Sequence, residues 1–413
     1  MSSASALSTT LTQEVQQIHA GAVVMLAHLH MERQITADAI EYVQPNVDLP
    51  GRQVDIPKLR QGGVNCIWLS EGGPGEVTID PVAKARSTTE PNDQPAMRTV
   101  FRGPAEVQRI LRGFDATRRL CRDYADTLEL AHSAKEIRSI AARGKIAVLL
   151  HTEALLIGND LAMLRSYHAL GMRVAGLVHA APLDWVDCDR EQRHADGLTD
   201  FGRQVIREMN ALGIVIDVSH SAESTIRTVL KESKQPIVAS HANVKRLSPL
   251  MRNLSDDVIR GIADGGGVVG IHCSSAFVDI ACLHGRSGGS GSLHGQPNLA
   301  MLEKIQTPGA IDPFAQEAAM RAKPGFAADA VFPTVHLERL IDHVDYLVNL
   351  VGIDHVGVGT DFQFLEDAVT DFDSAAKTPN LTAALLRRGY SPTAIRQILG
   401  ENFLRVIGAV VGE

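Results

Sequence analysis

Five short apolar runs in this 413-residue chain end in side chains that can bind metal ions. The terminal residues of these runs are His28 with His30, Glu153, His220, His241 and Asp361. Imidazole nitrogens and carboxylate oxygens are the ligands that zinc and similar divalent ions take in proteins. His28 and His30 stand two apart, so on a strand both side chains would lie on one face and could bind one ion. Glu153 has two carboxylate oxygens and could bridge two ions. The pattern therefore predicts a metal centre of the kind that hydrolases use to activate water.

The apolar runs also indicate the fold that would bring these side chains together. Three more runs, at residues 66–70, 174–180 and 268–273, bring the total to eight. Continuous Val, Ile and Leu runs are typical of parallel strands that are covered on both faces. Helical patterns separate them at residues 160–172, 198–213, 221–233 and 255–266, and a last one follows at 391–408. We therefore expect an α/β fold, a (β/α)8 TIM barrel, whose strands deliver their terminal residues to one rim.

We expect one domain over residues 1–413, with three stretches that depart from the strand and helix rhythm. Residues 1–20 form a polar N-terminal segment, and residues 71–103 and 274–330 are rich in turn formers and polar residues. Stretches of this length and composition predict insertions over the rim. The glycine-rich loop at 285–296 has no role that its sequence reveals.

Composition and charge limit the partners and the compartment. The formal net charge is -8, from 40 basic and 48 acidic residues without long runs of one sign, which predicts no binding of nucleic acid or of a membrane surface. The five cysteines include no Cys-x-x-Cys pair, as expected of reduced thiols. We expect no signal sequence, because the first twenty residues are polar and lack a basic start, and no apolar run is long enough to span a bilayer. We expect a cytoplasmic enzyme that acts on a small-molecule substrate.

Four longer motifs carry a resemblance to a known family. They are HADGLTDFGRQVIREMNALGIVIDVSH, SHANVKRLSPLMRNLSDDV, VGVGTDF and ILGENFLRV. With these motifs the chain resembles the membrane dipeptidases, the renal dipeptidase-like group known as peptidase family M19, in the metal-dependent amidohydrolase superfamily. The resemblance covers residues 20–408.

The resemblance implies a role for each of the predicted site residues. Two zinc ions (Zn2+) per chain would be held by His28, His30, Glu153, His220, His241 and Asp361. Glu153 would bridge the ions, and Asp361 would accept a proton from the water between them and donate it later. His179 would steady the carbonyl oxygen of the substrate as it becomes an anion. Arg252 would bind the substrate's carboxylate, for which its planar guanidinium is well shaped. The family also implies a homodimer.

Two departures from the family pattern bear on the metal and the substrate. The family usually has Asp-Gly-His-x-Asp at the first strand, whereas residues 26–30 read Leu-Ala-His-Leu-His. His30 thus replaces a carboxylate, and a single ion or another divalent metal becomes an alternative to two zinc ions. After Asp361 the chain reads Phe-Gln-Phe where the family often has Phe-Asp-Gly, so we expect a bulkier and less acidic pocket floor. His151 and His272 also end strands, and we expect them to be hydrogen-bonded rim histidines.

Three functions follow from these patterns. The first is hydrolysis of a small amide by a metal-bound hydroxide, with a dipeptide or a dipeptide-like compound with a free carboxylate as substrate. The second is a specialised amidohydrolase that acts on a non-peptide amide, a lactam or an ester. The third is a catalytically inactive barrel that serves as a binding protein.

Overall fold

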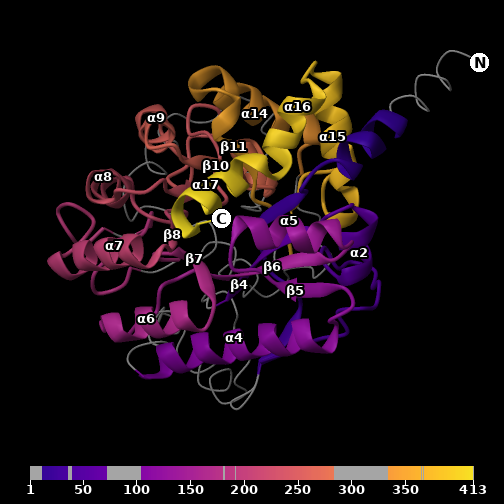
Figure 1. The fold of residues 1–413 in the computed structure, drawn as a ribbon. Helices are drawn as coiled ribbons and strands as arrows, with labels where there is room; N and C mark the ends of the chain where they lie inside the picture. Colours follow the sequence, from indigo (N-terminus) through magenta and orange to yellow (C-terminus); the bar gives the residue numbers. More distant parts are fainter. Residues whose placement is uncertain are drawn as a thin grey trace, which may run out of the picture.

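Eight parallel strands form the barrel that the sequence predicts. A computed structural model describes residues 12–35, 40–71, 104–179, 182–190, 192–282, 334–363, 365 and 367–412. The strands pair in the order β1-β4-β6-β7-β8-β9-β10-β11, and a parallel bridge between Ala27 and Gly359 joins the last strand to the first. Their bounds are Met25–Leu29, Cys66–Glu71, Ile146–Thr152, Met172–Gly176, Val215–Asp217, Val238–Ala239, Val268–Ile271 and Val356–Val358. Figure 1 shows the ring of helices around them. The fold prediction of a (β/α)8 TIM barrel is confirmed.

Four of the helices between the strands match the predicted helical patterns at 160–172, 198–213, 221–233 and 255–266. The helices around the barrel are α4 (Pro104–Asp123), α6 (Leu161–Ala169), α7 (Asp200–Leu212), α8 (Glu223–Glu232), α9 (Asp256–Asp264) and α14 (Leu337–Val351). α7 has sequence signals at both of its ends. The Thr199 side chain accepts a hydrogen bond from the Gly202 backbone, and Gly213 ends the helix at a φ of 71°. None of the helices in the described parts of the chain has an apolar stretch long enough to cross a bilayer.

Short elements complete the described structure. The predicted C-terminal helix consists of α16 (Pro392–Arg396), a π turn (Gln397–Glu401) and α17 (Asn402–Val411), and the side chain of Ser391 caps α16. The remaining helical elements are α2 (Ile56–Gln61), α5 (Ala134–Ala142), α10 (Ser275–Val278), η1 (Ile353–His355), η2 (Ala375–Lys377) and α15 (Thr378–Arg387). Residues 12–20 are also helical. Three strands that the sequence did not reveal are β5 (Leu128–Leu130), which pairs with β6, and the hairpin of β2 (Arg33–Ile35) with β3 (Ile40–Tyr42).

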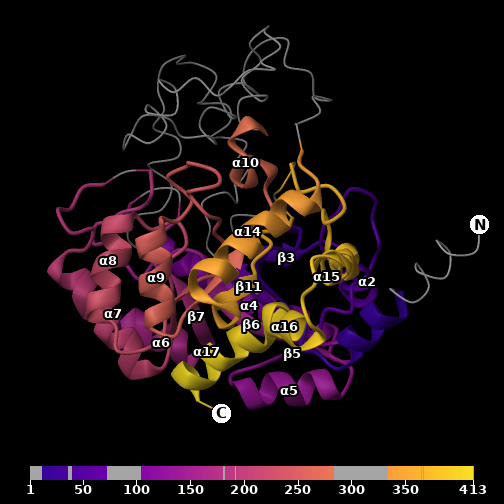
Figure 2. The ribbon, with the colours of Figure 1, turned by 90° about the horizontal axis from the view of Figure 1, so that it is seen from above.

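The C-terminal helix fills one end of the barrel, which leaves the other end for the site. Phe403 of α17 is fully buried, and a Cβ on Gly357 of β11 would lie only 2.2 Å from its ring. Inside the barrel the ring of Trp68 packs against Phe403, with centroids 4.8 Å apart, and its centroid lies 6.1 Å from that of His151. Figure 2 shows α5 and α17 at one end of the molecule and α10 at the opposite end. Most of the predicted insertions at 71–103 and 274–330 lie outside the described residues.

Candidate metal centre

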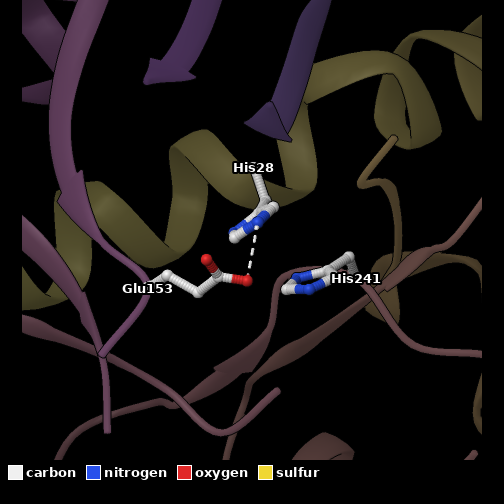
Figure 3. Close-up of side chains that lie close together, drawn as sticks. All are labelled: His28, Glu153 and His241. Atoms are coloured by element: carbon white, nitrogen blue, oxygen red, sulfur yellow. Dashed lines mark ion pairs between the residues drawn. The ribbon is translucent and has the colours of Figure 1, made fainter. Parts of the chain in front are cut away.

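The six predicted metal ligands converge at the carboxyl ends of the barrel strands. His28 lies in β1 and His30 just beyond it, Glu153 follows β6, His220 and His241 follow β8 and β9, and Asp361 follows β11. In Figure 3, His28, Glu153 and His241 point toward one another from β1 and from the segments that follow β6 and β9. Side chains more than 200 residues apart in the sequence therefore share one buried volume.

His28, His30 and Asp361 form a first group. The Nε2 atoms of the two histidines lie 3.2 Å apart, and Asp361 Oδ1 lies 3.4 Å from Nε2 of His28 and 3.5 Å from Nε2 of His30. The two histidines face each other although the strand is irregular here. The register of β1 shifts between Leu26 and Leu29, and His28 has a φ of 54°. Simple alternation along a regular strand is therefore not what brings the pair together.

Glu153, His220 and His241 form a second group. The Nε2 atoms of His220 and His241 lie 3.1 Å apart, and Glu153 Oε1 lies 3.4 Å from Nε2 of His220. The same Glu153 oxygen lies 3.6 Å from Nε2 of His28, and the rings of His28 and His241 stack with centroids 3.7 Å apart. Glu153 and the stacked rings thus join the two groups into one centre.

The chemistry of these donors fits divalent cations. Two facing Nε2 atoms can share at most one proton, and this centre has two such pairs with carboxylate oxygens aimed between them. A cation bound in each group would use all of these lone pairs at once. Nitrogen and oxygen donors in this mixture suit zinc and other first-row divalent metals.

Burial and neighbouring groups give the ligands the protonation states that metal binding requires. Burial lowers the pKa of His28 to about 4, against the influence of Asp361 and Glu153. Burial also lowers the pKa values of His220 and His241 well below the usual value. For the carboxyl groups of Glu153 and Asp361, burial acts to raise the pKa. Nevertheless His179 beside Glu153, and His272 beside Asp361, hold both carboxyl pKa values well below their usual range.

The backbone is strained at the strand ends that carry the ligands. His28, His220 and Asp361 have φ values of 54°, 65° and 56°, in the left-handed region that residues other than glycine rarely adopt. Strain of this kind costs of order 1–3 kcal/mol per residue and persists only where surrounding contacts impose it, most often at functional sites. Half of the predicted ligands share this feature, which sequence patterns do not reveal.

The two predicted substrate-binding residues lie beside the second group. His179 Nε2 is 3.0 Å from Glu153 Oε1, and its ring meets that of His220 edge-on with centroids 4.4 Å apart. The side chain of His179 is 16% exposed, the same fraction as that of Asp361, so both remain within reach of a substrate. Arg252 is buried rather than on the surface, and its Nη2 donates a hydrogen bond of 2.7 Å to the carbonyl oxygen of His241.

Comparison with known proteins identifies the family. The family model for membrane dipeptidases, peptidase family M19, matches residues 12–412. The chain belongs to the membrane dipeptidase family. As a member of this family it is a metal-dependent hydrolase of the dipeptidase type, so the inactive-barrel alternative loses its support.

Individual relatives agree with the family assignment. Dipeptidase tcpJ of Claviceps purpurea (strain 20.1) is 28% identical over 369 residues, which cover 89% of this chain and 71% of that protein. Dipeptidase aclJ of Aspergillus oryzae is 28% identical over 363 residues, which cover 87% of this chain and 70% of that protein. The crystal structure of the probable dipeptidase PvdM from Pseudomonas aeruginosa is similar with a TM-score of 0.77 at 25% identity, covering 97% of this chain and 98% of that one.

A buried network that the sequence analysis missed supports His241 in this M19 chain. The hydroxyl of Ser240 lies 2.8 Å from His241 Nδ1 and also donates to Asp217 Oδ2. Asp217 Oδ1 accepts the backbone N–H groups of Ser219 and Ser240 at 3.0 and 2.9 Å. Carboxylates that orient a ligand histidine through its other nitrogen are a recurrent feature of metal sites. The repeated Ser-His pairs at 219–220 and 240–241 were the available signal.

The other residues that the sequence analysis noted have defined positions. His151 lies inside the barrel, with Nε2 3.3 Å from Asp217 Oδ2 and its ring edge-on to His28. His272 contacts Asp361, at 3.1 Å. The side-chain oxygen of Gln363 accepts a bond of 3.4 Å from the backbone of Val54, while Phe364, the other half of the predicted pocket floor, lies outside the described residues.

Proposed function

We propose that this M19 chain hydrolyses the amide bond of a dipeptide, or of a dipeptide-like compound with a free carboxylate, with two zinc ions as cofactor. The observation that supports two ions is the arrangement of the donors in two groups that Glu153 joins. His28, His30 and Asp361 would hold the first ion, His220 and His241 the second, and Glu153 would bridge them. When bound, the ions would activate a shared water and polarise the scissile carbonyl.

The side chains around the centre would carry the remaining steps. The hydrogen bond with His272 holds the pKa of Asp361 well below its usual range, and Asp361 lies in the first group, so it could accept a proton from the attacking water and donate it to the leaving amine. His179 can donate a hydrogen bond to the carbonyl oxygen as negative charge develops there. Single donors of this kind are worth about 3 kcal/mol in other enzymes.

Arg252 would bind the free carboxylate of the substrate. Its bond to the His241 carbonyl holds the guanidinium beside the second group, and its Nε lies 3.9 Å from Asp189 Oδ2. A buried arginine interacts with an anion more strongly than an exposed one, because less water screens the two charges. This residue would favour substrates with a free carboxylate.

Metal quantification together with a substrate panel tests this function. Protein supplied with zinc should contain about two ions per chain and should release amino acids from dipeptides, and a strong chelator should abolish the activity. Asp361→Asn should lose turnover by a factor of about 10² to 10⁴, the usual contribution of a proton-transfer group. Arg203→Lys serves as a control, since this arginine of α7 pairs with Glu232 of α8 and with Asp196 in the turn before α7.

The same substrate panel distinguishes the second candidate function from the first. A specialised amidohydrolase should ignore plain dipeptides and cleave acylated or aromatic amino acid derivatives, lactams or esters, and the replacement of a carboxylate by His30 is the observation that keeps it open. Activity that survives the chelator would contradict both candidates. The predicted homodimer and cytoplasmic location stay predictions, and sedimentation of the purified protein would test the first.

A further inference from the structure

His272 lies against the oxygen of Asp361 that does not face the first group. It follows β10 directly, is 1% exposed, and its Nε2 is 3.1 Å from Asp361 Oδ2. Asp361 Oδ1, in contrast, lies near His28 and His30. The two oxygens of one carboxylate therefore contact different partners.

The hydrogen-bond network assigns the proton on the His272 ring. The backbone N–H of Ser274 donates to His272 Nδ1 at 2.9 Å. Since an N–H group can donate only to a lone pair, Nδ1 carries no proton, and the proton of the imidazole is on Nε2. Nε2 therefore donates to Asp361 Oδ2 and has no lone pair to offer to a metal ion. His272 is a donor to a ligand rather than a ligand itself.

The backbone of His272 is fixed independently of Asp361. Its N–H donates to Asn243 Oδ1 at 3.1 Å, and its carbonyl accepts from Asn243 Nδ2 at 3.0 Å. The ring packs edge-on against Phe277 of α10, with centroids 4.8 Å apart. The donor is thus held by the end of a barrel strand and by a buried asparagine, so it can impose an orientation on Asp361.

We propose that His272 is a positioning residue for Asp361: its Nε2–H holds Oδ2 and directs Oδ1 toward the first group. This inference rests on the proposed function, in which Asp361 holds an ion and transfers a proton. A carboxylate rotated away from this orientation would lose both its place as a ligand and its contact with the attacking water. Partners of this kind typically contribute factors of 10 to 100 in metal affinity or activity.

Two amide substitutions separate the positioning role from a structural one. In His272→Gln the side-chain N–H₂ can reach the position of Nε2 and keep the bond to Asp361. In His272→Asn the shorter side chain can accept from Ser274, as Nδ1 does, but cannot reach Asp361. We expect His272→Asn to lower kcat by 10- to 100-fold with KM changed by less than about threefold, and His272→Gln to stay within about threefold of the parent in both.

Zinc affinity, measured by competition with a chromophoric chelator and without substrate, gives a second readout. We expect weaker binding of the first-group ion by 10- to 100-fold in His272→Asn and not in His272→Gln. His355→Gln is the matched control. In the described structure the His355 ring forms a hydrogen bond with the Gly267 carbonyl, and it lies away from the centre. If the chain cleaves no dipeptide, the proposed function fails while this measurement still tests His272.

Specific results would overturn the inference. A purely structural role through Ser274 predicts the reverse order, with His272→Asn near the parent and His272→Gln impaired. Equal losses in both variants, or a change in KM alone, would also contradict it. In an Asp361→Asn background His272→Asn should add nothing to the loss, and an additive effect would show that His272 does not act through Asp361.

Discussion

At the scale of single residues, the centre is unusual in its charge. The first group contains two imidazoles and one carboxylate, and the second has two imidazoles and shares Glu153. Two divalent ions would thus face only two carboxylates. Residue types and spacing sufficed to predict which side chains meet. They could not predict which oxygen of Asp361 faces which histidine, because that depends on backbone angles at the strand ends.

Position 30 gives a direct test of this charge deficit. His30→Asp adds a third carboxylate to the first group, and we expect at least tenfold tighter binding of its ion, or about 1.4 kcal/mol, because a buried anion attracts a cation strongly. Competition against a chelator measures the affinity. His355→Asp adds the same charge away from the centre and serves as the control. Unchanged affinity in His30→Asp would mean that His30 does not contribute to the first-group site.

At the scale of elements, strands and helices were readable from the sequence but their cross-connections were not. β5 and the β2–β3 hairpin read Leu-Glu-Leu, Arg-Gln-Ile and Ile-Glu-Tyr, so they lack the continuous apolar runs that marked the barrel strands. Nothing in the sequence of α14 shows that His343 joins the loop after His241 to α10. Its Nδ1 accepts from the backbone of Val244 at 3.1 Å, and its Nε2 lies 2.8 Å from the Val278 carbonyl. These bonds connect α14 to the loop after His241 and to α10.

His343 should make the stability of the protein depend on pH. Burial lowers its pKa to about 4, although the bond to Val278 favours the charged form. Since the unfolded chain has a histidine pKa near 6.5, it binds more protons than the folded one between pH 6.5 and 4. The contribution of neutral His343 to the free energy of unfolding is therefore fully present above pH 6.5 and is lost as the pH falls. The loss is about 2 kcal/mol at pH 5.

Urea unfolding of metal-free protein at pH 7 and pH 5 measures this contribution. From pH 7 to pH 5 the free energy of unfolding of the parent should fall by about 2 kcal/mol more than that of His343→Gln, because glutamine does not titrate. His336→Gln removes an exposed histidine from the start of the same helix and is the matched control. The same pH dependence in parent and His343→Gln would contradict the assignment.

At the scale of the whole molecule, the junction that closes the barrel and the metal centre share the same backbone segments. Three hydrogen bonds across the junction of β1 and β11 involve site residues or their neighbours: Thr360 N to Ala27 O at 3.2 Å, Asp361 N to His28 O at 2.9 Å, and His30 N to Phe362 O at 3.0 Å. The sequence predicted eight strands and a polar rim. It could not predict how tightly the first and last strands approach, because that distance is a property of the closed barrel.

Gly359 shows how little room this junction has. A Cβ at Gly359 would lie 1.6 Å from the carbonyl oxygen of Ser240, the residue that supports His241. Gly359→Ala must therefore move either β11 or the end of β9, and we expect a loss of about 3 kcal/mol in the free energy of unfolding together with weaker metal binding. Gly265→Ala is the matched control, because a Cβ there meets its nearest atoms at 3.6 Å, an ordinary contact.

Urea unfolding and zinc titration of both variants measure the two effects. If Gly359→Ala were as stable as the control but bound zinc weakly, a change at the junction would affect the metal centre more than it affects the stability of the barrel. Unchanged zinc binding in an unstable Gly359→Ala variant would show that closure of the barrel and metal binding are separable.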